Sequence, residues 1–179
     1  MKFQGEVLDY FDVQKIVSNI FSDVMHSKRI QSVANAALGV VASGSLIIHR
    51  VGRGLAKANN LSDKHAIKQV DRLLSNENLN IEKTDKNWVL FLVGSRKDIK
   101  VTMDWTEFDL DSHVTICLNL ITSHGRATPL LSKTVDKNTL KDHRNDYEDE
   151  ILNRLYNALA EDVHVTIFAD RGFCDIKLF

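Results

Sequence analysis

The sequence predicts an α+β protein, with a helical first half followed by a second half in the order β-β-β-α-β. Apolar residues recur at helical spacing in residues 12–25 and 61–76. Apolar and polar residues alternate, between short turn segments, across residues 98–135. A chain of 179 residues, 26% of them charged, is long enough to bury a core in one domain or in two small ones.

The first half predicts three helices and one ambiguous segment. The first helix covers residues 12–25, and the second begins near Ser27 and ends before the segment 42–46, ASGSL. Residues 46–59 are ambiguous because their two glycines lower helix stability. The apolar run 33–48 is too short and too rich in Asn, Ser and Gly to span a bilayer. Its small residues instead predict closely packed helices.

The third helix, in residues 61–76, is amphipathic. Ser62 is a suitable N-cap. The predicted buried face consists of Ala66, Ile67, Val70, Leu73 and Leu74. At about 100° per residue, Lys64, Lys68 and Arg72 line up on the opposite side. This pattern fits an ordinary surface helix, and it equally fits a helix that lies against DNA phosphates.

Charge is distributed unevenly, although the net charge is only −1. Basic residues greatly outnumber acidic ones in residues 28–72, whereas acidic residues are in excess in residues 101–179. Such a division indicates a polyanion-binding module joined to a second part, or else two solvated faces of opposite sign. The polar segment 75–87 is the expected connection, which predicts domains at residues 1–85 and 86–179.

The second half predicts strands at residues 98–105, 113–121 and 127–135, then a long helix at 136–162. A buried strand follows at residues 163–173, and residues 175–179 begin another.

Two aspartates, Asp104 and Asp170, are expected at the ends of the first and fourth strands. A strand, a crossover helix and a parallel strand form a right-handed unit, in which these two ends can be neighbours. Adjacent carboxylates repel each other unless a cation lies between them, and Mg²⁺ or Mn²⁺ prefers such oxygen ligands. The alternative is that Asp104 and Asp170 cap strands or pair with Lys100 and Arg171.

Two segments, VTMDWTEF (101–108) and VTIFADRGF (165–173), closely resemble the DDE-class insertion-sequence transposases. Residues 49–76, HRVGRGLAKANNLSDKHAIKQVDRLLSN, resemble the helical region that precedes the catalytic core of that family. The resemblance extends from about residue 26 to the end. It implies a ribonuclease-H-like core, of which this chain holds the first half of the mixed sheet. The implied activity is metal-dependent DNA strand cleavage and transfer, that is, DNA transposition.

The same resemblance assigns roles to individual residues. Asp104 and Asp170 match the first and second catalytic aspartates, which would hold Mg²⁺ or Mn²⁺. The helical region would bind double-stranded DNA at the terminal inverted repeats of a mobile element. Its candidate DNA-binding residues are Arg50, Arg53, Lys57, Lys64, Lys68 and Arg72. The expected location is the bacterial cytoplasm, associated with the nucleoid, and a homodimer is compatible with the sequence.

One departure from the family concerns the third catalytic acid, a glutamate on a later helix. The chain ends at Phe179, so the sequence predicts the N-terminal portion of a transposase, truncated before that acid and inactive alone. The alternative is a non-catalytic DNA-binding protein that competes for the ends of the element. Glu148 or Glu150 could replace the missing acid, but a solvated acidic turn at residues 148–150 is the simpler interpretation. Cys117 and Cys174 are interpreted as core residues.

Overall fold

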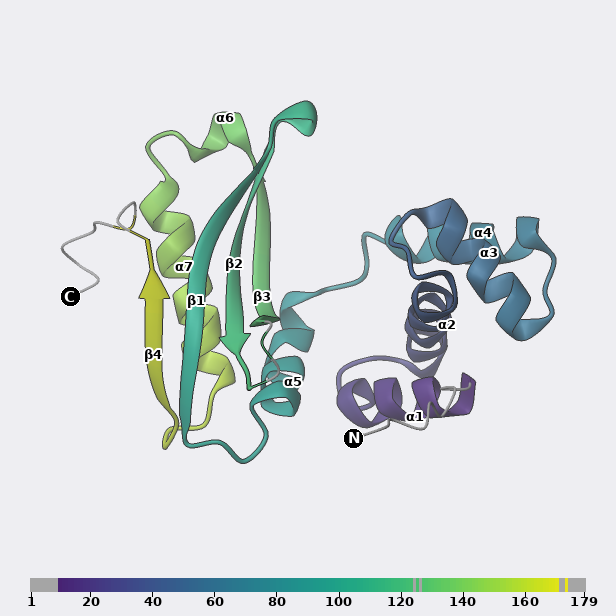
Figure 1. Ribbon diagram of the computed structural model, residues 1–179, viewed down its shortest axis with the longest axis horizontal. Helices are drawn as coiled ribbons and strands as arrows, with labels where there is room; N and C mark the ends of the chain where they lie inside the picture. Colours follow the sequence, from purple (N-terminus) through teal and green to yellow (C-terminus); the bar gives the residue numbers. More distant parts are fainter. Residues whose placement is uncertain (1–9, 124, 126, 171–172, 174–179) are drawn as a thin grey trace. The chain divides into compact units, whose positions relative to one another are not determined.

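The computed structural model describes residues 10–123, 125, 127–170 and 173, and it is α+β as predicted (Figure 1). The chain forms two compact units, Met1–Ile81 and Glu82–Phe179. The predicted domain boundary between residues 85 and 86 falls inside a helix of the second unit, α5 (Glu82–Val93).

The first unit is helical. It contains α1 (Tyr10–Phe21), α2 (Ser27–Ser43), α3 (Ile48–Asn59) and α4 (Asp63–Leu74). The ambiguous segment 46–59 is therefore mostly helix. Ser62 occupies the N-cap position of α4, although its side chain makes no capping hydrogen bond. The prediction that Leu74 is buried is wrong, because 63% of this residue is exposed.

Close contacts between helix backbones explain the small residues of α2 and α3. A Cβ atom on Gly39 would lie 2.5 Å from the carbonyl oxygen of Val51, and one on Gly54 would lie 2.5 Å from the carbonyl oxygen of Gly39. A Cβ atom on Gly52 would lie 2.5 Å from the Cα atom of Ile67 in α4. Any side chain at these positions would force the helices apart, which confirms the predicted close packing.

The second unit is built on a mixed sheet in the order β3-β2-β1-β4 (Figure 1). Its strands are β1 (Asp98–Phe108), β2 (His113–Ile121), β3 (Ala127–Asp136) and β4 (His164–Ala169). β2 is antiparallel to both of its neighbours, β1 and β3, and the short 3₁₀ helix η1 (Asp109–Asp111) joins β1 to β2. β4 pairs with β1 in parallel, from Asp98 with His164 to Met103 with Ala169.

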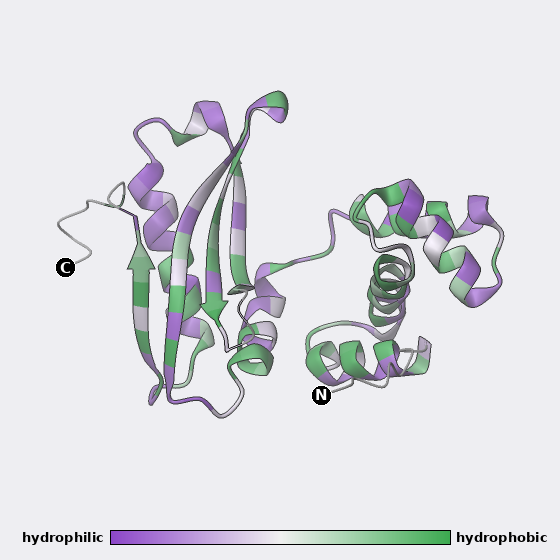
Figure 2. Cartoon of the chain, viewed as in Figure 1, coloured by the Kyte–Doolittle hydropathy of each residue, from purple (hydrophilic) through white to green (hydrophobic). Residues whose placement is uncertain are grey.

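Helices cover one face of this sheet. Val89 and Val93 of α5 and Ile151 and Leu155 of α7 (Arg144–Ala158) share a buried cluster with side chains from β1 and β2. Apolar and polar residues alternate along both strands, so the opposite face is polar (Figure 2).

The second unit differs from the prediction in three places. α5 is absent from the predicted elements, because its polar first turn has the composition of a connecting segment. The long helix is interrupted after α6 (Lys137–Leu140), where Asp142 has a φ of +67°. The fourth strand is not buried, because β4 lies at the sheet edge in the described part of the chain. The strand predicted at residues 175–179 lies outside the described residues.

Candidate metal centre and nucleic-acid interface

Asp104 lies on the face of the sheet opposite the helices. Its neighbours Met103 and Trp105 point to the helix-covered side, whereas Asp104 is exposed and opposes Cys117 of β2. The predicted end of the strand near Asp104 is wrong, because β1 continues to Phe108 alongside β2. The pairing that ends at this level is the one with β4, after Met103 and Ala169.

Asp170 directly follows β4 and is exposed. Because Met103 pairs with Ala169, Asp104 and Asp170 are the next residues along two neighbouring parallel strands. The structure therefore brings their backbone positions side by side. The carbonyl oxygen of Asp170 accepts a hydrogen bond from the backbone N–H of Phe173, at 3.2 Å.

The charge of Asp104 contributes to the pKa of Cys117, its neighbour across the strands. The pKa of the Cys117 thiol is raised above its ordinary value, mainly by burial and also by the negative charge of Asp104. Cys117 is half-buried, but it lies on the polar face with Asp104 and outside the buried cluster, so the prediction that it packs in the core is wrong.

Two carboxylates form a small donor set for a metal ion. Among the described residues, no three His, Cys, Asp or Glu side chains are grouped so that they could hold a metal together. Mg²⁺ is commonly bound through one or two carboxylates, several waters and substrate phosphates. The donors at Asp104 and Asp170 therefore fit a hydrated divalent ion that shares a phosphate ligand, and they do not fit a closed protein cage.

The acidic residues at the start of α7 do not join these aspartates. Glu150 pairs with Lys133 of β3, and Asp149 is exposed. Glu148 is only 1% exposed, and it accepts hydrogen bonds from the indole N–H of Trp105 and from Nε of Arg144. The expectation of a solvated acidic turn is therefore wrong for Glu148. The start of α7 is hydrophilic in Figure 2, although Glu148 lies at helical spacing with the buried Ile151 and Leu155.

The acidic residues near the β1–β2 connection have a structural partner. Lys137 pairs with Glu107 and with Asp109, the latter at 2.8 Å. Its ammonium group lowers the pKa of Asp109, and both carboxylates raise the pKa of Lys137. Asp109 and Asp111 belong to η1 at this turn, whereas Glu107 still belongs to β1, where it pairs with Val114.

Three of the six predicted DNA-binding residues line one groove. Arg53 of α3 and Lys64 and Lys68 of α4 border a groove of about 490 Å³ between these helices. Asp63 and Asp71 line it too, and Arg53 lies 3.6 Å from Asp63. His49 also lines the groove, although sequence reasoning did not single it out.

The remaining predicted cations, Arg50, Lys57 and Arg72, are exposed but do not line this groove. Arg50 and Lys57 belong to α3, and Arg72 belongs to the basic row of α4. The exposed side of Lys64, Lys68 and Arg72 agrees with the predicted amphipathic pattern, since Ala66, Val70 and Leu73 are buried.

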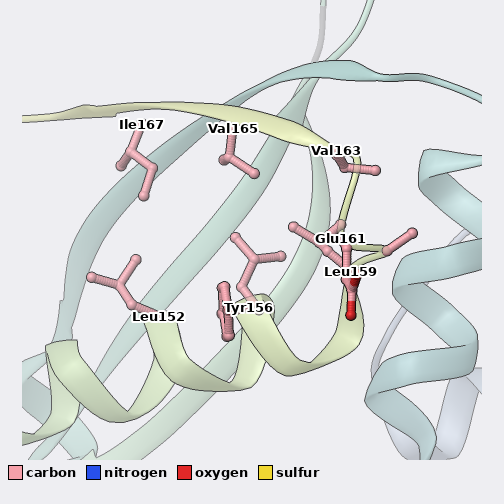
Figure 3. A pocket seen from close by; sticks show the side chains of 9 residues that line it. Leu152, Tyr156, Leu159, Glu161, Val163, Val165 and Ile167 are labelled. Atoms are coloured by element: carbon pink, nitrogen blue, oxygen red, sulfur yellow. The ribbon is translucent and has the colours of Figure 1, made fainter.

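An apolar cavity of the second unit lies on the helix side of β4. It has a volume of about 600 Å³ and separates Val163, Val165 and Ile167 from Leu152 and Tyr156 of α7 (Figure 3). Glu161 is the one charged residue in its lining. With a single carboxylate in its lining, this cavity offers no set of metal ligands. The proposed metal ligands Asp104 and Asp170 do not line it.

Within the described residues, no single helix is long and apolar enough to cross a membrane. The pair α2 and α3 passes that test only when combined, and it is bent by 95°.

Comparisons with known proteins give no further assignment. No family model, curated protein or solved structure matches the chain.

Proposed function

We propose that this chain is a transposase-family protein, which binds duplex DNA through its helical unit and a divalent metal ion at Asp104 and Asp170. The observation that carries this proposal is the parallel pairing of β1 with β4, which makes the two aspartates neighbours. The strand order β3-β2-β1-β4 with one crossover helix supports a ribonuclease-H-like core.

The metal ion would supply the chemistry of strand cleavage. It would polarise a phosphate and activate the attacking oxygen. Asp104 and Asp170 would hold it, on the polar face of the sheet where a DNA backbone could approach. Because the family uses a third acid besides these two carboxylates, we assign only metal binding and DNA binding to this chain. Strand transfer would require a further acid.

DNA binding would rest on α3 and α4. The turn between them has three residues, Asn60–Ser62, a connection length found in helix-turn-helix DNA-binding units. Cations on both helices would contact phosphates. The carboxylates in the groove, Asp63 and Asp71, would weaken non-specific binding.

The test of DNA binding is a salt titration. Fluorescence anisotropy with a labelled duplex would give the affinity of the wild type, of Lys64→Gln/Lys68→Gln, and of a matched control, Lys86→Gln/Lys141→Gln. Loss of two phosphate contacts should make the slope of log affinity against log salt shallower by about 1.8. An unchanged slope in the first variant, or an equal change in the control, would refute the assignment.

The test of metal binding is calorimetry with Mn²⁺ alone. Asp104→Asn/Asp170→Asn should abolish binding, whereas Asp149→Asn/Glu161→Gln removes two exposed acidic residues elsewhere and should not. If the wild type takes up no Mn²⁺ but binds DNA, the second candidate function is correct. That candidate is a non-catalytic DNA-binding regulator, and the mixed charge of the α3–α4 groove together with the small acidic set favours it.

A further inference from the structure

A buried carboxylate lies behind the proposed metal site, on the helix-covered side of the sheet. Glu148 belongs to the second turn of α7, and its side chain is 2% exposed. Its Oε1 atom accepts a hydrogen bond from Nε1 of Trp105 at 2.8 Å and one from Nε of Arg144 at 3.2 Å. Because Trp105 and Asp104 are consecutive strand residues, Glu148 and Asp104 lie on opposite faces of β1.

Arg144 extends these contacts to the segment after β4. Its guanidinium carbon lies 5.5 Å from the ring centre of Trp105 and 5.8 Å from that of Phe173. Both distances are within the range of cation–π attraction. Phe173 is buried in the core, and its backbone N–H donates to the carbonyl of Asp170.

The first turns of α7 thus hold both aspartate-bearing segments. Trp105 immediately follows Asp104, and Phe173 lies three residues after Asp170 and is hydrogen-bonded to it. Glu148 contacts Trp105 and Arg144 directly and Phe173 through Arg144.

Packing alone does not account for an acid at this position. Removing a carboxylate from water costs several kcal/mol, and a buried ion pair is often no better for stability than apolar residues. Among the residues that the structure describes, Arg144 is the one cation paired with Glu148, and its side chain is 43% exposed. Burying Glu148 therefore lowers the stability of the fold unless its two hydrogen bonds, to Trp105 and Arg144, serve a further purpose.

We propose that Glu148 is a positioning residue, which fixes the separation of Asp104 and Asp170 through Trp105 and Arg144 without binding the metal itself. This inference rests on the proposed metal-binding function. It assigns the acid of α7 to the support of the two aspartates, and it explains why Glu148 lies apart from any group of metal ligands.

The test compares Mn²⁺ affinity among variants of the full chain. Glu148→Gln keeps an acceptor for the indole but removes the charge facing Arg144, and Glu148→Leu removes both contacts. We expect affinity to fall about tenfold in Glu148→Gln, as for groups that orient ligands, and further in Glu148→Leu. Trp105→Phe removes the hydrogen-bond donor and part of the ring volume but keeps an aromatic ring for Arg144, and it should weaken binding at least as much as Glu148→Gln.

The matched control is Asp85→Ala. It removes another buried carboxylate of the same unit, which contacts Arg154 at the other end of α7, and should lower stability while leaving Mn²⁺ affinity within about twofold. If Glu148 had a purely structural role, its variants would likewise lose stability while keeping their Mn²⁺ affinity.

The outcomes separate the two proposals. If the wild type binds Mn²⁺ and all three site variants bind it equally well, the positioning role is refuted while the metal site stands. If the wild type does not bind Mn²⁺, both are refuted. Should Glu148→Leu fail to fold, Glu148→Gln and Trp105→Phe still decide the question.

Discussion

The contact between Asp85 and Arg154 predicts a large and specific loss of stability. Asp85 of α5 accepts from Nε and Nη2 of Arg154 in α7, at 2.8 and 2.7 Å, and the two side chains are only 11% and 16% exposed. Asp85→Ala leaves the guanidinium buried without a partner. Breaking such pairs typically costs 3–5 kcal/mol, and the residual exposure places this one near the lower limit, about 3 kcal/mol.

Thermal unfolding followed by tryptophan fluorescence isolates this effect. Both tryptophans of the chain, Trp88 and Trp105, belong to the second unit. At about 4–8 °C per kcal/mol for a unit of this size, the midpoint should fall by about 12–24 °C. The exposed pair Lys97–Asp162 provides the control, since Asp162→Asn should give a shift several-fold smaller.

Asp85→Asn separates the role of the hydrogen bond from that of the charge. Burial raises the pKa of Asp85 above its ordinary 3.8, and the contact with Arg154 opposes this only in part. A raised pKa in the folded state means that stability is fully present below pH 3.8 and declines as the pH rises through the folded pKa. The amide side chain in Asp85→Asn keeps a hydrogen-bond acceptor for Arg154 but carries no negative charge whose burial costs free energy.

Asp85→Asn should therefore lose less stability than Asp85→Ala at neutral pH, because it keeps an acceptor although Arg154 loses its counter-charge, and its difference from the wild type should shrink in acid, where Asp85 is protonated. A loss in Asp85→Asn as large as that in Asp85→Ala would refute the reasoning. It would show that the negative charge, and not the acceptor, stabilises the contact.

Two further predictions concern the glycines and the free thiol. Gly52→Ala should destabilise the helical unit by about 1–2 kcal/mol, measured by circular dichroism, because overpacking against the backbone of Ile67 outweighs the better helix propensity of Ala. Asp104→Asn should lower the pKa of Cys117, so that alkylation in a Cys174→Ser background becomes faster at a fixed pH below that pKa. An unchanged rate would mean that the Asp104 charge does not act on the thiol.

Local sequence patterns were sufficient where each element depends on its own residues. The predicted strand 113–121 coincides with β2, and the basic row of α4 lies opposite its buried residues. The prediction that the first and fourth strands are neighbours follows from the general rule that a crossover between parallel strands is right-handed.

Other features depend on partners far away in the sequence. Glu148 shares the buried stripe of Ile151 and Leu155 on α7, but its hydrogen-bond partner Trp105 lies 43 positions away and cannot be read from α7 itself. β4 is apolar like a central strand, yet it lies at the sheet edge of the described residues and most of it is exposed. The polar first turn of α5 concealed a helix whose later residues, Val89 and Val93, are buried.

Exposure explains why Asp104 is tolerated in a strand, but it does not explain the contacts made by the residues around it. Aspartate is unfavourable in strands, but Asp104 faces a polar sheet surface with Thr102 and Thr106 on the same side, so its exposure alone makes it tolerable. Exposure does not explain why the next residue, Trp105, donates to a buried carboxylate, nor why Arg144 lies against both Trp105 and Phe173. Those contacts restrain the two segments that carry Asp104 and Asp170. A solvated surface pair would have no need of such restraint, whereas the proposed cation site would depend on it.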